Sequence, residues 1–222
     1  MSLPLVLGFL GGYLIGSVPI GYILVQWRSR VDIRSAGSGN VGALNASVVT
    51  GSKGMGILVG VLDGVKGGVA VWVAWILGDA FWVAALALLG SVIGHNYPVW
   101  LGFKGGRGLA TACGGLFLIG LAYTIVWCTL WAVLKATKQT ILAANLLATL
   151  ATPIVLFLLP APSVAAVMTS QATLTEFRIL AVCLSAVLYL RHHEGWQELA
   201  QPRPEEPTSG ERSPSPDKER TL

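Results

Sequence analysis

Long apolar runs alternate with short polar segments along the 222 residues of this chain. Six runs are candidate membrane spans, since about 20 residues of helix cross the hydrocarbon core of a bilayer. They lie at residues 3–27, 54–77, 79–97, 109–134, 139–160 and 172–190. We expect helices in all of them, because lipid offers the backbone no hydrogen-bond partner. The pattern predicts an all-α integral membrane protein, built as a helical bundle.

The polar segments between the runs carry most of the cations of the chain. These segments are residues 28–53, 104–107, 135–138 and 191 onward. The positive-inside rule places all of them in the cytoplasm. That is possible if run 109–134 goes out and back as two short helices that turn near Gly120–Tyr123. We therefore predict seven spans, two of them short, with the N-terminus outside and the glycine-rich loops and the C-terminal tail cytoplasmic; five or six spans are the alternative.

Composition supports a membrane protein and divides the chain into two parts. Hydrophobic residues make up 54% and charged residues 12% of the sequence, about half the charged fraction of a soluble domain. A conventional soluble enzyme is excluded, and the basic balance indicates orientation in a membrane rather than nucleic-acid binding. We predict one transmembrane domain over residues 1–199 and a disordered cytoplasmic tail over residues 200–222, which are rich in Pro, Ser and Glu.

The first polar segment contains a glycine-rich motif, residues 37–45, with the sequence GSGNVGALN. Closely spaced glycines leave backbone N–H groups free to converge on an anion. Polar side chains add uncharged donors. The candidate phosphate-binding residues are Ser38, Gly39, Asn40, Gly42 and Asn45. A tight turn between two spans is the alternative explanation.

The second polar segment places two cations on either side of two glycines at the start of a predicted helix. Its candidate site residues are Lys104, Gly105, Gly106 and Arg107. The cations supply charge and the helix start supplies N–H groups, which together suit a second anion site. A positive-inside anchor is the alternative, although an anchor does not need the glycines.

Several titratable residues are candidates for a role at the same site. Asp63 and Lys66 lie one helical turn apart inside an apolar run, where charges are costly unless they pair or face a polar cavity. They form either a functional site or a structural ion pair. His95 precedes the second loop, and His192 lies at the end of the last span. With three histidines and no clustered carboxylates, we expect no metal site.

Four motifs together resemble those of the bacterial acyl-phosphate-dependent glycerol-3-phosphate acyltransferases. They are G-S-V-P-x-G at 16–21, D-I-R-x-x-G-S-G-N-x-G-A-x-N at 32–45, L-D-x-x-K-G at 62–67 and G-H-x-x-P-x-x-x-x-F-K-G-G-R-G-x-A-T at 94–111. The resemblance implies a seven-helix bacterial plasma-membrane enzyme with a cytoplasmic active site. It implies acyl transfer from acyl phosphate to the sn-1 hydroxyl of glycerol 3-phosphate, giving lysophosphatidic acid in the first committed step of phospholipid synthesis. It implies no cofactor, no metal and no coenzyme A thioester.

The resemblance also assigns roles to residues. It implies that Ser38, Lys104 and His192 are catalytic and that the two glycine-rich loops hold the phosphates and the acyl carbonyl. Asp63, Lys66 and His95 would shape the pocket. Because no side-chain base stands out, we expect a substrate phosphate oxygen to accept the hydroxyl proton, while positioned donors stabilise the tetrahedral intermediate.

The chain departs from the family pattern at polar positions. Leu44 and Val48 stand where the family usually has Thr and Arg, Ile141 stands at a loosely aligned Ser, and Gly195 replaces the Asn of the third motif. Loss of the Arg removes a bidentate phosphate ligand. Either neighbouring groups such as Arg34, Lys53 or His193 replace these donors, or the chain is a divergent paralogue with weak or no catalysis that binds acyl phosphate in a regulatory role. A small anion transporter is disfavoured, because the charged groups crowd one face and no repeat is visible.

Overall fold

The computed structural model describes residues 3–78, 80–169 and 172–192, and within these ranges the chain is helical with no strand. The tail at 200–222 and the positions His193 and Gly195 lie outside the described residues. The α-helices are α1 (Leu3–Ser17), α2 (Ile20–Ser29), α3 (Ala43–Thr50), α4 (Lys53–Leu77), α5 (Phe81–Asn96), α6 (Leu109–Ile119), α7 (Ala122–Ala136), α8 (Ile141–Leu158), α9 (Ala161–Ala165) and α10 (Leu174–His192). Two short 3-10 helices are η1 (Ile33–Ser35) and η2 (Val99–Leu101).

The first apolar run is a broken helix rather than the continuous helix that the sequence predicts. α1 ends at Ser17 and α2 begins at Ile20. Pro19 has no N–H to donate and disfavours helical backbone at the residue before it, so the helix is interrupted there. The carbonyl of Val18 accepts hydrogen bonds of 3.0 Å from the N–H of Ile20 and from Lys66 Nζ. The break therefore brings a polar backbone group to a charged side chain of α4.

The run 109–134 is also divided, at Gly120, into helices α6 and α7 of 11 and 15 residues. Both are short for a span. Four helical stretches are long and apolar enough to cross a membrane by length and composition: Leu3–Ser29, Lys53–Leu77, Phe81–Leu101 and Ile141–Leu158. The last helix, α10, is 19 residues long and carries charges at Glu176, Arg178 and Arg191. The architecture is thus all-helical with at least four candidate spans, and the count of seven stays a prediction.

Helices α1 and α5 pack backbone to backbone through glycines. A Cβ atom on Gly12 would lie 2.1 Å from the carbonyl oxygen of Ala87, and one on Gly94 would lie 2.2 Å from that of Tyr13. Small residues at four-residue spacing let two membrane helices approach this closely. The spacing Gly8, Gly12, Gly16 is readable in the sequence and predicts such an interface, but our sequence interpretation did not use it.

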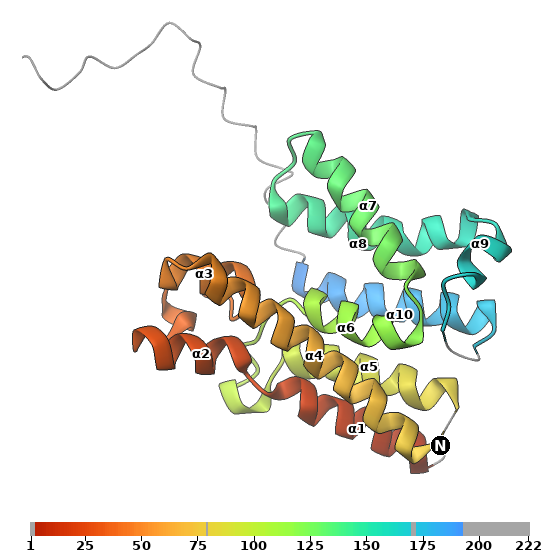
Figure 1. Cartoon of the computed structure of the whole chain (residues 1–222), viewed down its shortest axis with the longest axis horizontal. Coiled ribbons are helices and arrows are strands. Elements are labelled where there is room, and N and C mark those ends of the chain that lie inside the picture. The colour runs from red at the N-terminus through yellow and green to blue at the C-terminus, as the bar shows by residue number, and fades with distance from the viewer. Residues whose placement is uncertain (1–2, 79, 170–171, 193–222) are drawn as a thin grey trace, which may run out of the picture.

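The helices form two groups joined by α10, which lies between the α1–α4–α5 group and the α7–α8 pair (Figure 1). The main core cluster draws buried side chains from α5, α6 and α10, such as Leu88, Leu116 and Leu184. A second cluster lies at one end of the bundle, where Leu101 of η2 packs with Ile33 and Val41. This second cluster holds the segments around the two glycine-rich motifs against each other.

Candidate active site

The two glycine-rich segments meet at a cavity of about 200 Å³. We call it the polar cavity because half of the residues that line it have polar or charged side chains, although apolar atoms make up most of its wall. Seven of the residues that the sequence analysis selects line it: Ser38, Asn40, Gly42, Asn45, Asp63, His95 and Arg107. Other wall residues are Ala43, Leu44, Gly108, Leu109, Ala110, Ile141 and Asn145. Motifs that are far apart in the sequence therefore share one cavity.

Two uncapped helix N-termini line this cavity. α3 begins after Gly42 and α6 begins after Gly108, and neither glycine offers a side chain to cap the first turn. The first-turn N–H groups of a helix bind anions, and the helix dipole adds positive potential there. Because residues of both first turns line the same cavity as the guanidinium-bearing Arg107, the wall is suited to a phosphate.

The first loop is organised by the side chain of Asn45. Its Oδ1 accepts a hydrogen bond from the N–H of Ser38 at 2.9 Å, and its Nδ2 donates to the carbonyls of Ile33, Ala36 and Asn40. Asn45 is 4% exposed. Its amide is thus used by the protein backbone, and the residue shapes the loop. It lines the cavity as a positioning group rather than as the additional donor that the sequence predicts.

The N–H groups of the selected glycines also have acceptors within the protein. Gly39 donates to Ala36, Gly42 to the side chain of Asn40, Gly105 to Asn96 and Gly106 to His95. The expectation that glycine N–H groups of the first loop stay free for an anion is therefore wrong for Gly39 and Gly42. Space explains the second pair of glycines, because a Cβ on Gly106 would lie 2.0 Å from Nε2 of His95.

Asp63, Lys66 and His95 form one buried polar cluster. Lys66 Nζ lies 2.9 Å from Asp63 Oδ1, and His95 Nδ1 lies 3.4 Å from the same oxygen. Lys66 also donates to the carbonyl of Val18 at the helix break. Asp63 and His95 line the cavity, whereas Lys66 does not. The ion pair keeps the carboxylate charge compensated beside an anion site, so the structural and functional explanations of the pair are compatible.

Lys104 and His192, both predicted to be catalytic, do not line the polar cavity. Lys104 is exposed at the surface of the second loop. His192 is buried, 1% exposed, and its Nδ1 lies 2.8 Å from the carbonyl oxygen of Leu188. Because that oxygen can only accept, Nδ1 carries a proton. Both catalytic roles stay predictions.

The three described positions that depart from the family pattern present apolar side chains near the cavity. Leu44 and Ile141 line it, and Val48 follows Leu44 by one turn of α3; they are 57%, 40% and 64% exposed. Arg34 does not replace the missing guanidinium, because it makes a bidentate pair with Asp32 and lies 5.1 Å from the centre of the Tyr22 ring. That pairing, through the Arg34 hydrogen bonds above all, lowers the pKa of Asp32.

Two residues of the site were missed from the sequence. Asn145, on α8, is 8% exposed and lines the cavity; a polar amide inside an apolar run was the available signal. Arg191, at the end of α10, donates to the carbonyls of Gly106 and Gly105 over distances of 3.2 and 3.0 Å. No local pattern indicates these contacts, since 85 and 86 residues separate the partners in the chain.

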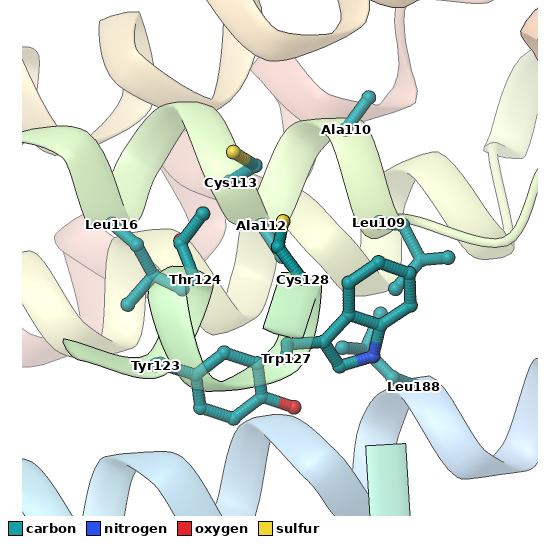
Figure 2. A pocket seen from close by; sticks show the side chains of 10 residues that line it. All are labelled: Leu109, Ala110, Ala112, Cys113, Leu116, Tyr123, Thr124, Trp127, Cys128 and Leu188. Carbon is teal, nitrogen blue, oxygen red and sulfur yellow. The ribbon is translucent and has the colours of Figure 1, made fainter. Parts of the chain in front are cut away.

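A second cavity, of about 220 Å³, lies between α6 and α7 and is almost entirely apolar. Figure 2 shows its lining, which includes Cys113 from α6, Tyr123 and Trp127 from α7 and Leu188 from α10. The hydroxyl of Tyr123 is hydrogen-bonded to that of Ser185 at 2.8 Å, so the ring is fixed in place. This cavity suits an alkyl chain.

Leu109 and Ala110 line both cavities, so the polar and apolar cavities share a wall at the start of α6. This arrangement fits an amphiphile with a phosphate at one end and a hydrocarbon chain at the other. Among the described residues, no group of three or more His, Cys, Asp or Glu side chains is placed to hold a metal ion. Fold and site together define a multi-pass membrane protein in which a cavity with polar side chains adjoins an apolar one.

Comparison with known proteins identifies the family. The model of the family described as glycerol-3-phosphate acyltransferase matches residues 6–202. Relatives of that name include one from Mesorhizobium japonicum, 36% identical with 90% of this chain and 94% of that protein covered, and one from Rhodopseudomonas palustris strain HaA2, 42% identical with 85% and 88% covered. A relative from Erythrobacter litoralis is 47% identical, with 57% of this chain and 65% of that protein covered.

Solved structures agree with this result. The chain is similar to the crystal structure of PlsY, an integral membrane glycerol 3-phosphate acyltransferase, in its glycerol 3-phosphate form, with a TM-score of 0.71 and 32% identity over 88% of this chain and 91% of that one. The lysophosphatidic acid form of PlsY matches with the same TM-score and 31% identity. The chain therefore belongs to the glycerol-3-phosphate acyltransferase family, and its class of reaction is acyl transfer in phospholipid synthesis.

Proposed function

We propose that this protein transfers the acyl group of an acyl phosphate to the sn-1 hydroxyl of glycerol 3-phosphate, giving lysophosphatidic acid and inorganic phosphate. The observation that supports it most is the shared wall of the two cavities at Leu109 and Ala110. A donor with its phosphate in the polar cavity and its chain in the apolar cavity would place its carbonyl near this wall. The proposed ligands are the two substrates, acyl phosphate and glycerol 3-phosphate, with no cofactor.

In the proposed reaction the hydroxyl oxygen of glycerol 3-phosphate attacks the acyl carbonyl carbon. The bond between that carbon and the phosphate oxygen breaks, and phosphate leaves with its electron pair. The hydroxyl proton passes to a substrate phosphate oxygen. Arg107 and the N-termini of α3 and α6 would hold the phosphates and stabilise the developing oxyanion, because such donors are in place before reaction. Ser38, Lys104 and His192 are the proposed catalytic residues.

We propose seven spans in the bacterial plasma membrane, with the N-terminus outside and the active-site loops inside. Ser35 lies in the first polar segment, and the exposed residue Ser163 lies in α9 between α8 and α10. In a cysteine-free protein, Ser35→Cys should react with an impermeant maleimide only after cells are opened, and Ser163→Cys should react in intact cells. The reverse result would overturn this orientation.

A product assay tests the reaction. Purified protein in lipid, given palmitoyl phosphate and labelled glycerol 3-phosphate, should form labelled lysophosphatidic acid. Ser38→Ala and Lys104→Ala should abolish product. Lys135→Ala is the matched control, because Lys135 lies in the last turn of α7, outside both glycine-rich motifs, and bonds to the carbonyl of Gln139. Absence of product with acyl chains of several lengths would overturn the proposal.

One observation favours a second candidate, a non-catalytic paralogue that binds acyl phosphate in a regulatory role. Leu44 and Val48, which stand where the sequence resemblance implies Thr and Arg, are exposed apolar residues. This candidate predicts that acyl phosphate raises the melting temperature without turnover. Formation of lysophosphatidic acid would show that the protein is the enzyme. If acyl phosphate gives neither product nor a higher melting temperature, both candidate functions are excluded.

A further inference from the structure

Arg191 connects the last helix to the glycine-rich loop of the candidate active site. Its Nη2 donates to the carbonyl of Gly105 at 3.0 Å and its Nε to that of Gly106 at 3.2 Å. The guanidinium carbon lies 5.4 Å from the centre of the Tyr97 ring. A planar guanidinium can bond two acceptors and stack on a ring at once, which an ammonium group cannot do.

These contacts fix the direction of two peptide groups. The N–H groups of Gly105 and Gly106 already donate to the carbonyls of Asn96 and His95 at the end of α5. The described part of the chain has no cis peptide bond. In a planar trans peptide the C=O and the following N–H point in opposite directions. Arg191 therefore holds the negative ends of these dipoles toward α10, and the N–H of Arg107 points away from it.

The residues that follow are those that face the anion site. Arg107 lines the polar cavity and Gly108 is the N-cap of α6, whose first turn also lines it. A rotated Gly106–Arg107 peptide would move the guanidinium of Arg107 and the start of α6 together. It would also turn a carbonyl oxygen toward bound phosphate, which is repulsive.

We propose that Arg191 is a positioning residue for phosphate binding, which it controls by clamping the carbonyls of Gly105 and Gly106. The inference rests on the proposed function for its substrates. Arg191 does not line the cavity and is not assigned a bond to substrate. Tyr97 supports the clamp through its ring, and the hydroxyl of Tyr13 holds the carbonyl of Tyr97 at 3.0 Å.

Arg178 on the same helix provides a matched control. Its guanidinium also bonds backbone carbonyls, those of Leu156 and Leu159, and lies 5.2 Å from the centre of the Phe157 ring. It serves the other end of α10, away from both glycine-rich loops. The two arginines thus make the same kind of contact, and only one of them acts on the candidate site.

The test compares Arg191→Gln with Arg178→Gln in the full-length protein in lipid. Arg191→Gln should raise the KM for glycerol 3-phosphate about tenfold or more and remove the thermal stabilisation that this ligand gives. Without ligand, Arg178→Gln should lower the melting temperature as much as Arg191→Gln does. It should leave the KM for glycerol 3-phosphate and the stabilisation by this ligand unchanged. In Arg191→Ala, millimolar guanidinium should lower KM again, with no such effect on Arg178→Ala.

An unchanged KM and unchanged ligand stabilisation in Arg191→Gln would overturn the inference. If Arg191→Gln does not fold, Arg191→Lys and Tyr97→Leu take its place, and both should raise KM severalfold; a wild-type KM in both also overturns it. Failure of the proposed function looks different, because the wild-type protein then forms no product. In that case the thermal stabilisation by glycerol 3-phosphate can still be measured in wild type and in Arg191→Gln. Equal stabilisation of the two proteins, or no stabilisation of the wild type, would count against the clamp.

Discussion

At the scale of single residues, the candidate site depends on side chains that bond to the protein backbone as much as on side chains that face the cavity. Asn45 satisfies four backbone groups of the first loop. Lys66 donates to the Val18 carbonyl at the Pro19 break, which also accepts from the N–H of Ile20. Buried polar groups left without partners are costly, so such residues fix the shape of a site without contacting the substrate.

Asn45→Ala tests this at the first loop. The change removes the partner of the Ser38 N–H and of the Asn40 carbonyl, whereas the carbonyls of Ile33 and Ala36 keep bonds to backbone N–H groups. A buried polar group left unpaired costs roughly 1–3 kcal/mol. We expect a lower melting temperature in detergent and loss of most activity. Thr50→Ala is the control on the same helix, since Thr50 bonds only to the carbonyl one turn before it. Equal stability of Asn45→Ala and wild type would contradict the assigned role.

At the scale of elements, the helices are positioned by glycines that let backbones touch and by breaks that free polar groups. α1 approaches α5 through Gly12 and Gly94, and α4 approaches α6 through Gly67 and Gly114. Dispersion contacts and close packing hold membrane helices together, because lipid provides no hydrophobic drive between them. α5 and α6 flank the second loop, so this packing places the site.

The pair Gly11 and Gly12 offers a direct test of the α1–α5 contact. Gly12→Ala places a Cβ 2.1 Å from the Ala87 carbonyl oxygen, whereas a Cβ on Gly11 meets nothing within 4 Å. Overpacking of this kind costs roughly 1–3 kcal/mol. Gly12→Ala should therefore lower the melting temperature in detergent, and Gly11→Ala should leave it unchanged or raise it, since alanine favours helix. The same melting temperature for both variants would contradict the packing.

At the scale of the whole molecule, the two groups of helices place a polar cavity beside an apolar one. The polar cavity draws on α3, α6 and α8, and the apolar cavity on α6, α7 and α10. α6 is common to both. A substrate that is charged at one end and apolar at the other fits this arrangement, which explains why a short helix with a glycine N-cap sits at the centre of the site.

Cys128→Phe tests whether the apolar cavity holds the acyl chain. Cys128 lines the cavity on α7, and a phenyl ring there would displace about two methylene groups at about 0.8 kcal/mol each. We expect the KM for palmitoyl phosphate to rise about tenfold, with a smaller change for a short-chain acyl phosphate. Ile125→Phe, on the same helix but outside the lining of the cavity, is the control and should have no effect. Equal effects of the two variants would place the chain elsewhere.

Much of this could be predicted from the sequence. The family, the helical membrane class and seven of the cavity residues follow from apolar runs and from motifs whose chemistry is local. The broken first helix could also have been read from Pro19. The free N–H groups expected at Gly39 and Gly42 could not be checked from the sequence, because a backbone donor is free or occupied according to how the loop folds and which acceptor then reaches it.

The sequence by itself determined that the protein lies in a membrane and which two glycine-rich segments are the candidates for the site, because hydropathy, charge and glycine spacing act over a few residues. The tertiary structure decided how that chemistry is assembled. It placed the N-termini of α3 and α6 at one cavity, joined that cavity to an apolar one, and brought Arg191 to Gly105 and Gly106 across more than 80 residues of chain. Such contacts depend on how whole helices pack, and no local pattern encodes them.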